Sequence, residues 1–112
     1  MSLVMSPALN NLQQRCNPGV AEGVIIAPSS KSMMQRAVGA ATQVKGETVI
    51  LHPSFSNDGH AALQVAAALG SSVKIEHDKV VIVGGGAPTG EALNCGESGY
   101  SMRMFCAIAS TY

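Results

Sequence analysis

The stretch Ala27–Arg36 (APSSKSMMQR) decides the predicted fold, because the chain changes there from a strand pattern to a helix pattern. The unbroken apolar run just before it, Gly23–Ala27, is typical of a buried strand. Pro28, Ser29 and Ser30 then supply the residues that favour the start of a helix. Free backbone N–H groups and the positive end of the helix dipole meet at such a junction, which favours an anionic ligand.

The helix that follows is predicted to run from Lys31 to about Val44. Its apolar residues recur at helical spacing, and we expect Met33 and Met34 to lie on its buried side. Lys45 precedes Gly46, which is the natural left-handed cap for its end.

The remaining predicted elements continue the alternation of strands and helices. They are a strand at 47–51, a helix from about 57 to 70, strands at 72–76 and 79–83, a short strand at 92–94 and a helix from about 98. Only His77 and Asp78 separate the third and fourth strands, which predicts a hairpin. The order β-α-β-α-β-β, followed by the start of another β-α, indicates an α/β fold of the α+β type.

This order divides the chain into three parts. Residues 1–20 are irregular, 21–84 form a first βαβαββ unit, and 85–112 form a loop and the start of a second unit. The apolar helical pattern of Met102–Thr111 has no cap and no element after it. We therefore expect the chain to be part of a larger protein, and to leave apolar surface through which it can self-associate.

A second strand-to-helix junction lies in Leu93–Phe105 (LNCGESGYSMRMF). Its glycines, including Gly99, allow a ligand to approach the backbone closely. Glu97 either supplies a favourable charge at the helix start or hydrogen-bonds a ligand hydroxyl. Arg103, one turn into the helix, either pairs with Glu97 as a structural brace or contacts a ligand.

Cationic and polar side chains gather at the first junction. Ser32 and Arg36 lie four residues apart on one helix face, as do Lys31 and Gln35. The guanidinium of Arg36 matches a carboxylate or phosphate through two parallel hydrogen bonds, and Lys31 supplies a mobile point charge. The alternative is an ordinary capped helix with solvated charges. Two such junctions indicate a ligand with more than one negative group.

Composition removes several other classes of function. The formal net charge of zero argues against a broad nucleic-acid or membrane-surface footprint, and no run approaches the ~20 apolar residues of a membrane span. The three cysteines and three histidines are scattered without the spacing of a metal site, and the cysteines fit free thiols in the cytoplasm. No helix pattern directly follows Gly84–Gly86, so we expect no dinucleotide-binding site there.

Three motifs together resemble the N-terminal part of the EPSP synthase (3-phosphoshikimate 1-carboxyvinyltransferase) family, over about residues 21–112. They are Ser30-Lys31-Ser32-x-x-Gln35-Arg36, Ser56-Asn57-Asp58, and Gly96-Glu97-Ser98-Gly99-x-x-Met102-Arg103. Many family members have Asn-Ala-Gly-Thr where this chain has Glu97–Tyr100, so the role of Glu97 stays open. The sister family, UDP-N-acetylglucosamine enolpyruvyl transferase, is similar in fold but normally has Lys-Asn in place of Lys31-Ser32.

The resemblance implies transfer of an enolpyruvyl group from phosphoenolpyruvate to the 5-hydroxyl of shikimate 3-phosphate, on the pathway to chorismate and the aromatic amino acids. It implies no cofactor and a two-domain, inside-out α/β barrel of six βαβαββ units, of which this chain holds one and the start of a second. The rest of the enzyme would then be the partner of this chain, which alone would be inactive. The alternatives are the sister transferase and a non-catalytic module that binds phosphorylated metabolites.

The resemblance also implies roles for individual residues. Lys31 is the catalytic residue and reaches both substrates, while Ser32 and Arg36 hold the shikimate carboxylate. Gly99 lines the phosphoenolpyruvate pocket, where glyphosate also binds. Glu97 and Arg103 complete the expected substrate-binding set.

Overall fold

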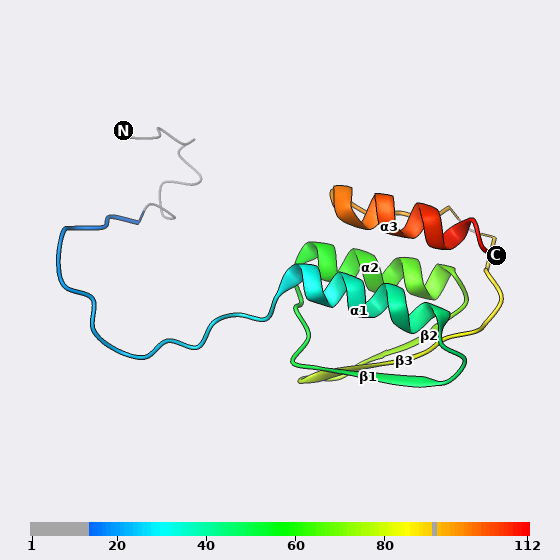
Figure 1. Ribbon diagram of the computed structural model, residues 1–112, viewed down its shortest axis with the longest axis horizontal. Helices are drawn as coiled ribbons and strands as arrows, with labels where there is room; N and C mark the ends of the chain where they lie inside the picture. The colour runs from blue at the N-terminus through cyan, green and yellow to red at the C-terminus, as the bar shows by residue number, and fades with distance from the viewer. Residues whose placement is uncertain (1–13, 91) are drawn as a thin grey trace.

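The fold combines one small sheet with three helices, as Figure 1 shows. The computed structural model describes residues 14–90 and 92–112. Its elements are, in order, α1 (Lys31–Gln43), β1 (Glu47–Leu51), α2 (Asn57–Ala68), β2 (Ser72–Ile75), β3 (Lys79–Val83) and α3 (Gly99–Ala109). These elements confirm a mixed α/β class and the positions predicted for all three helices and for three of the strands.

The sheet has the strand order β1-β3-β2, and both neighbouring pairs are antiparallel. The predicted hairpin is confirmed, since Ile75 of β2 pairs with Val80 of β3 and the Glu76 N–H bonds to the Lys79 carbonyl oxygen at 2.9 Å. Side chains alternate along β3, so that Val80 and Ile82 are fully buried under the helices.

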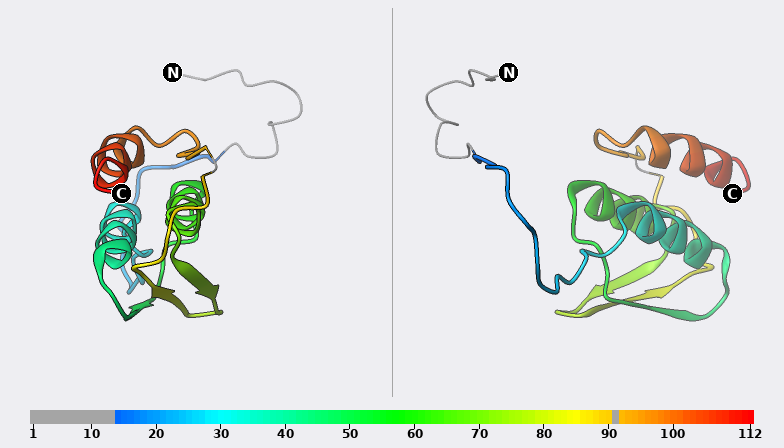
Figure 2. Two further views of the ribbon diagram at one scale, coloured as in Figure 1. Left: turned by 90° about the vertical axis from the view of Figure 1, so that its right-hand side faces the viewer. Right: turned by 60° about the vertical axis from the view of Figure 1, so that its left-hand side comes forward.

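The elements form three layers, which Figure 2 shows end-on. Helices α1 and α2 cover one face of the sheet, and α3 packs on these two helices rather than on the sheet. Phe105 of α3 is fully buried with Val38 of α1 and Val65 of α2, so the third layer shares the core of the other two. Burial of an aromatic side chain of this size is a large apolar contribution to docking α3.

Two predicted strands are wrong. The run 23–27 is not a strand, and Val24, Ile25 and Ile26 are each more than 90% exposed. The run has a strand's composition, but no described strand pairs with its backbone, and ladder partners are what define a strand. Residues 92–94 are likewise coil. Residues 14–20 contain no helix or strand, and the rest of the irregular segment predicted at 1–20 lies outside the described residues.

Two details of the predicted helices are also wrong. Met34 is buried as expected, but Met33 is 58% exposed, and the inward position is taken by Gln35. The last turn of α3 is not left open, because the Ser110 N–H bonds to the Cys106 carbonyl oxygen at 3.2 Å and the Tyr112 hydroxyl donates to the Thr42 carbonyl oxygen at 3.2 Å. This last bond ties the end of the chain to α1. Among the described helices, none combines the length and apolar character needed to cross a membrane.

Candidate functional site at the helix N-termini

Each of the three helices begins with a serine cap. Ser30 accepts a hydrogen bond from the Met33 N–H at 3.3 Å, Ser56 from the Gly59 N–H at 3.2 Å and Ser98 from the Ser101 N–H at 3.1 Å. A side-chain cap satisfies only one of the free N–H groups in the first turn. Each helix start therefore keeps further N–H groups and the positive end of its dipole for another acceptor.

The three helix starts lie at the same end of the helix layers, as Figures 1 and 2 show. Side chains join them in pairs. Lys31 on α1 forms an ion pair with Asp58 on α2, with Nζ and Oδ2 2.8 Å apart. Gln35 on α1 donates to the cap hydroxyl of Ser98 at 2.6 Å. The two junctions singled out in the sequence are thus brought together, with the start of α2 beside them.

Lys31 is the cation that joins the starts of α1 and α2. Its hydrogen bond to the Asp58 carboxylate raises the pKa of its ammonium group above the ordinary 10.5, and the charges of Asp58 and Glu97 act in the same direction. The Lys31 side chain is 55% exposed while that of Asp58 is 13% exposed. Lys31 is therefore held protonated at neutral pH with one side open to a ligand.

The sign of this pKa shift sets its effect on stability. Because folding raises the pKa of Lys31, the ion pair with Asp58 stabilises the fold fully below pH 10.5. That contribution is lost as the pH rises through the folded-state pKa. Since the ammonium group is open to solvent, salt screens the contribution and keeps it small.

Arg36 lies one turn beyond Ser32, and both side chains are exposed. The Arg36 Nε donates to the Tyr100 hydroxyl at 3.2 Å, and the guanidinium carbon lies 5.7 Å from the centre of the Tyr100 ring. This contact joins the second turn of α1 to the first turn of α3. The structure therefore places Lys31, Ser32 and Arg36 on the exposed side of the α1 start, as the sequence predicts.

The predicted residues of the second junction surround the start of α3. Arg103 donates from Nε to the Gly99 carbonyl oxygen at 3.3 Å, and no ion pair joins Arg103 to Glu97 among the described residues. The proposed brace between these two side chains is thus absent, and the backbone holds Arg103 instead. A methyl group placed on Gly99 would meet no atom within 4 Å, so the backbone there faces open space.

Gln35, Asp58 and Tyr100 are the residues whose contacts sequence reasoning missed. Gln35 is 1% exposed and also donates to Ser101 at 2.8 Å, so a buried amide locks α1 to the start of α3. The sequence marks Asp58 only as part of the Ser56-Asn57-Asp58 motif. Its helix-start position was a usable signal, but its pairing with Lys31 depends on how α1 and α2 pack.

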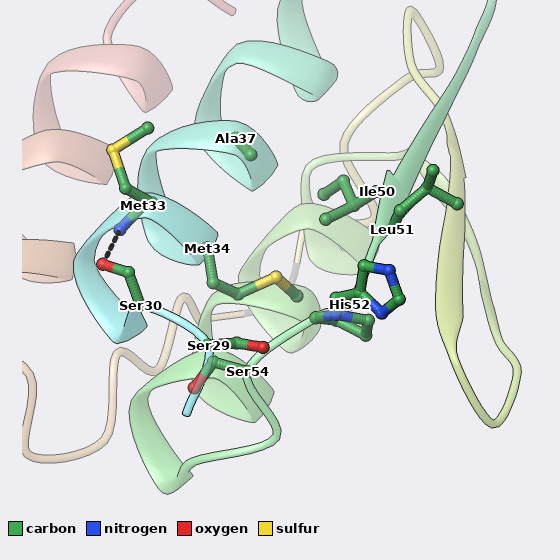
Figure 3. Close-up of a pocket in the computed structure, with 10 residues that line it drawn as sticks. Ser29, Ser30, Met33, Met34, Ala37, Ile50, Leu51, His52 and Ser54 are labelled. Carbon is green, nitrogen blue, oxygen red and sulfur yellow. Dashed lines mark hydrogen bonds between the residues drawn. The ribbon is translucent and has the colours of Figure 1, made fainter. Parts of the chain in front are cut away.

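A pocket of about 190 Å³ lies beside the cap of α1, and Figure 3 shows the residues around it. It is lined by the α1 start, the end of β1 and the loop that follows, through Ser29, Ser30, Met33, Met34, Ala37, Ile50, Leu51, His52, Pro53 and Ser54. Most of this lining is apolar, and none of the predicted charged residues contributes to it. The charged groups lie instead on the open surface where the helices begin.

The three helix starts and the sheet all lie within a match to a known protein family. A family model described as EPSP synthase (3-phosphoshikimate 1-carboxyvinyltransferase) matches residues 17–112. The chain belongs to the EPSP synthase family. The match takes in all six described elements and every predicted site residue.

Individual relatives agree with the EPSP synthase assignment. The chain is 41% identical over 92 residues to the 3-phosphoshikimate 1-carboxyvinyltransferase of Methanocorpusculum labreanum, covering 79% of this chain and 22% of the relative. It is 35% identical over 95 residues to that of Clostridium perfringens, covering 82% and 22%. The corresponding protein of Streptococcus pyogenes is 32% identical over 105 residues, covering 89% and 24%. The chain thus spans less than a quarter of the length of these EPSP synthase relatives.

Proposed function

We propose that this chain supplies one wall of the active site of an enzyme that transfers the enolpyruvyl group of phosphoenolpyruvate to shikimate 3-phosphate. The observation that carries the proposal is that three helix N-termini lie at one end of the helix layers, joined by the Lys31–Asp58 ion pair, the Gln35–Ser98 hydrogen bond and the Arg36–Tyr100 hydrogen bond. In the reaction, a bond forms between the 5-hydroxyl oxygen and the enol carbon, the bond from that carbon to the phosphate oxygen breaks, and phosphate leaves. The hydroxyl proton passes to a base outside the residues assigned here.

The charges of the site suit these two substrates. Each substrate carries a phosphate and a carboxylate, so that four anionic groups must be held. Dipole-backed N–H groups and fixed cations can position such groups and stabilise charge that develops in the transition state. Three cations, Lys31, Arg36 and Arg103, surround the helix starts against two carboxylates, Asp58 and Glu97.

Specific roles for the residues follow. Lys31 contacts both substrates, and Ser32 with Arg36 binds the shikimate carboxylate. Gly99 lines the phosphoenolpyruvate pocket, and Arg103 adds a cation through the nitrogens that its bond to Gly99 leaves free. Glu97 faces the ligand as an acceptor for a hydroxyl, and its charge helps to keep Lys31 protonated.

We further propose that α1, β1, α2, β2 and β3 are the last five elements of a βαβαββ unit, and that α3 belongs to the next unit. The first strand of the unit, expected at 23–27, is coil in this structure. The matched segment covers only 22% of each of two relatives, which leaves room for further units and the opposite wall of the site. The EPSP synthase match favours this reaction over that of the sister transferase. A non-catalytic binding module stays the second candidate, and kinetics distinguish it.

Replacing Arg36 by alanine tests the proposed function most directly. In the full-length protein, Arg36→Ala is expected to raise the KM for shikimate 3-phosphate about tenfold to a hundredfold, because a charged two-pronged contact to its carboxylate is lost. Steady-state kinetics with each substrate varied in turn give the answer. Lys45→Ala, just beyond the other end of α1, is the control and should behave as wild type. An increase confined to the KM for phosphoenolpyruvate contradicts the assignment.

Replacing Gly99 by alanine probes the other substrate. A methyl group there meets no protein atom, so the fold should be unchanged, but it enters the space given to phosphoenolpyruvate. We expect the KM for phosphoenolpyruvate and the inhibition constant of glyphosate to rise at least about tenfold. Gly19→Ala, whose Cβ also meets no atom within 4 Å and which lies in no helix or strand, is the matched control. Unchanged inhibition by glyphosate would make Gly99 a structural residue only.

A further inference from the structure

The Arg36 side chain is held from one side by Tyr100. Its Nε donates to the Tyr100 hydroxyl at 3.2 Å, and its guanidinium carbon lies 5.7 Å from the centre of the same ring. The phenol thus meets the guanidinium both as a hydrogen-bond acceptor and through its aromatic system. Both residues are exposed, Tyr100 to 39%.

This contact uses one of the five N–H groups of Arg36 and leaves the others. Within residues 14–90 and 92–112, Arg36 has no ion pair and no second hydrogen bond from its side chain. The four N–H groups on its two Nη atoms therefore stay available. These two nitrogens are a fork that can bind both oxygens of a carboxylate or two oxygens of a phosphate.

Holding the guanidinium in place also lowers the entropy that is lost when a ligand binds. A free arginine side chain loses much rotamer freedom when a ligand immobilises it, and a side chain that is already held loses less. Tyr100 stands in the first turn of α3, and α3 is locked to α1 by the buried bonds of Gln35 to Ser98 and Ser101. The anchor for Arg36 is therefore a rigid element of the core.

We propose that Tyr100 is a positioning residue for the anionic substrate. It holds Arg36 by Nε so that the free Nη pair binds the carboxylate of the ligand at the three helix starts. The inference rests on the proposed function, in which that ligand is shikimate 3-phosphate. Arg103 has a different anchor, the Gly99 carbonyl oxygen, so Tyr100 acts through Arg36.

The test is a double-mutant cycle in the full-length protein, with shikimate 3-phosphate binding measured by calorimetry. Tyr100→Phe removes the hydroxyl and keeps the ring, and should weaken binding about threefold to tenfold. In the Arg36→Ala background the same change should have less than about a twofold effect, because the group that Tyr100 holds is gone. The KM for phosphoenolpyruvate should not change. Tyr112→Phe, which removes a hydroxyl bonded at the same 3.2 Å to the Thr42 carbonyl, is the matched control.

An equal loss of affinity in both backgrounds would show that Tyr100 contacts the ligand itself and would overturn the inference. A second measurement does not depend on the ligand. Solvent exchange of the Arg36 Nε–H, followed by nitrogen-15 NMR, should be faster in Tyr100→Phe and unchanged in Tyr112→Phe. Unchanged exchange in Tyr100→Phe overturns the inference and leaves the proposed function standing. Faster exchange together with wild-type shikimate 3-phosphate affinity in Arg36→Ala instead refutes the proposed function, and the positioning role with it.

Discussion

Replacing Lys31 by methionine in the full-length protein is expected to lower kcat/KM more than about a hundredfold without unfolding it. The Lys31 side chain is 55% exposed and has one partner among the described residues, the Asp58 carboxylate, so methionine removes the charge with little change in packing. Loss of a cation that stabilises developing charge in the transition state has an effect of this size. Steady-state kinetics give the change in rate, and thermal unfolding shows that the fold is retained.

Control variants separate the loss of the Lys31 charge from its effect on Asp58. Lys45→Met, just beyond the other end of α1, should keep wild-type kinetics. The variant Lys31→Met also leaves the largely buried Asp58 carboxylate without its partner. The double variant with Asp58→Asn removes that carboxylate and should be as inactive as Lys31→Met alone. Wild-type kcat/KM in Lys31→Met or in the double variant would remove Lys31 from the site.

The single variant Asp58→Asn adds a pH dependence with a definite sign. Asp58 is the main cause of the raised pKa of Lys31, so its loss lowers that pKa towards the ordinary 10.5. The alkaline limb of the kcat/KM profile should therefore move to lower pH, while the acid limb stays in place. An alkaline limb that does not move would show that the protonation of Lys31 is not required.

Replacing Gly70 by alanine is expected to cause a large loss of stability. Gly70 has a φ of +94°, and a Cβ there would collide with the Ala87 carbonyl oxygen in the loop after β3. That loop is tied to the end of α2, where the Thr89 N–H bonds to the Ala68 carbonyl oxygen at 3.0 Å. Because backbone rather than a flexible side chain blocks the methyl group, the helix end and the loop must separate.

Gly90 is the matched control for this substitution. Its φ of +81° is similarly unfavourable for alanine, but a Cβ there meets no atom within 4 Å. Gly90→Ala should therefore cost about 1 kcal/mol from backbone strain alone, and Gly70→Ala at least about 2 kcal/mol more. Urea unfolding measures the loss of stability in both variants, and an unchanged m-value shows that the two-state comparison holds. Equal losses of unfolding free energy in the two variants would show that the loop moves aside without a free-energy penalty.

Much of the local structure was determined by the sequence alone. Serine at positions 30, 56 and 98 predicts three helix starts, because its side chain satisfies a free N–H group wherever it stands before a helical pattern. The hairpin at 72–83 follows from two alternating runs separated by two polar residues. The placement of Lys31, Ser32 and Arg36 on the exposed side of α1 follows from helical spacing, while their roles in binding stay predictions.

The tertiary structure decided what depends on residues distant in sequence. The run 23–27 has a strand's composition, yet a strand needs a neighbouring backbone, and no local pattern supplies one. Gln35 is buried in place of Met33 because two serine hydroxyls of α3 satisfy its amide, and a buried polar group is stable only when it is bonded in this way. The partnership of Lys31 with Asp58 and that of Arg36 with Tyr100 likewise exist only because packing brings three separate helix starts together.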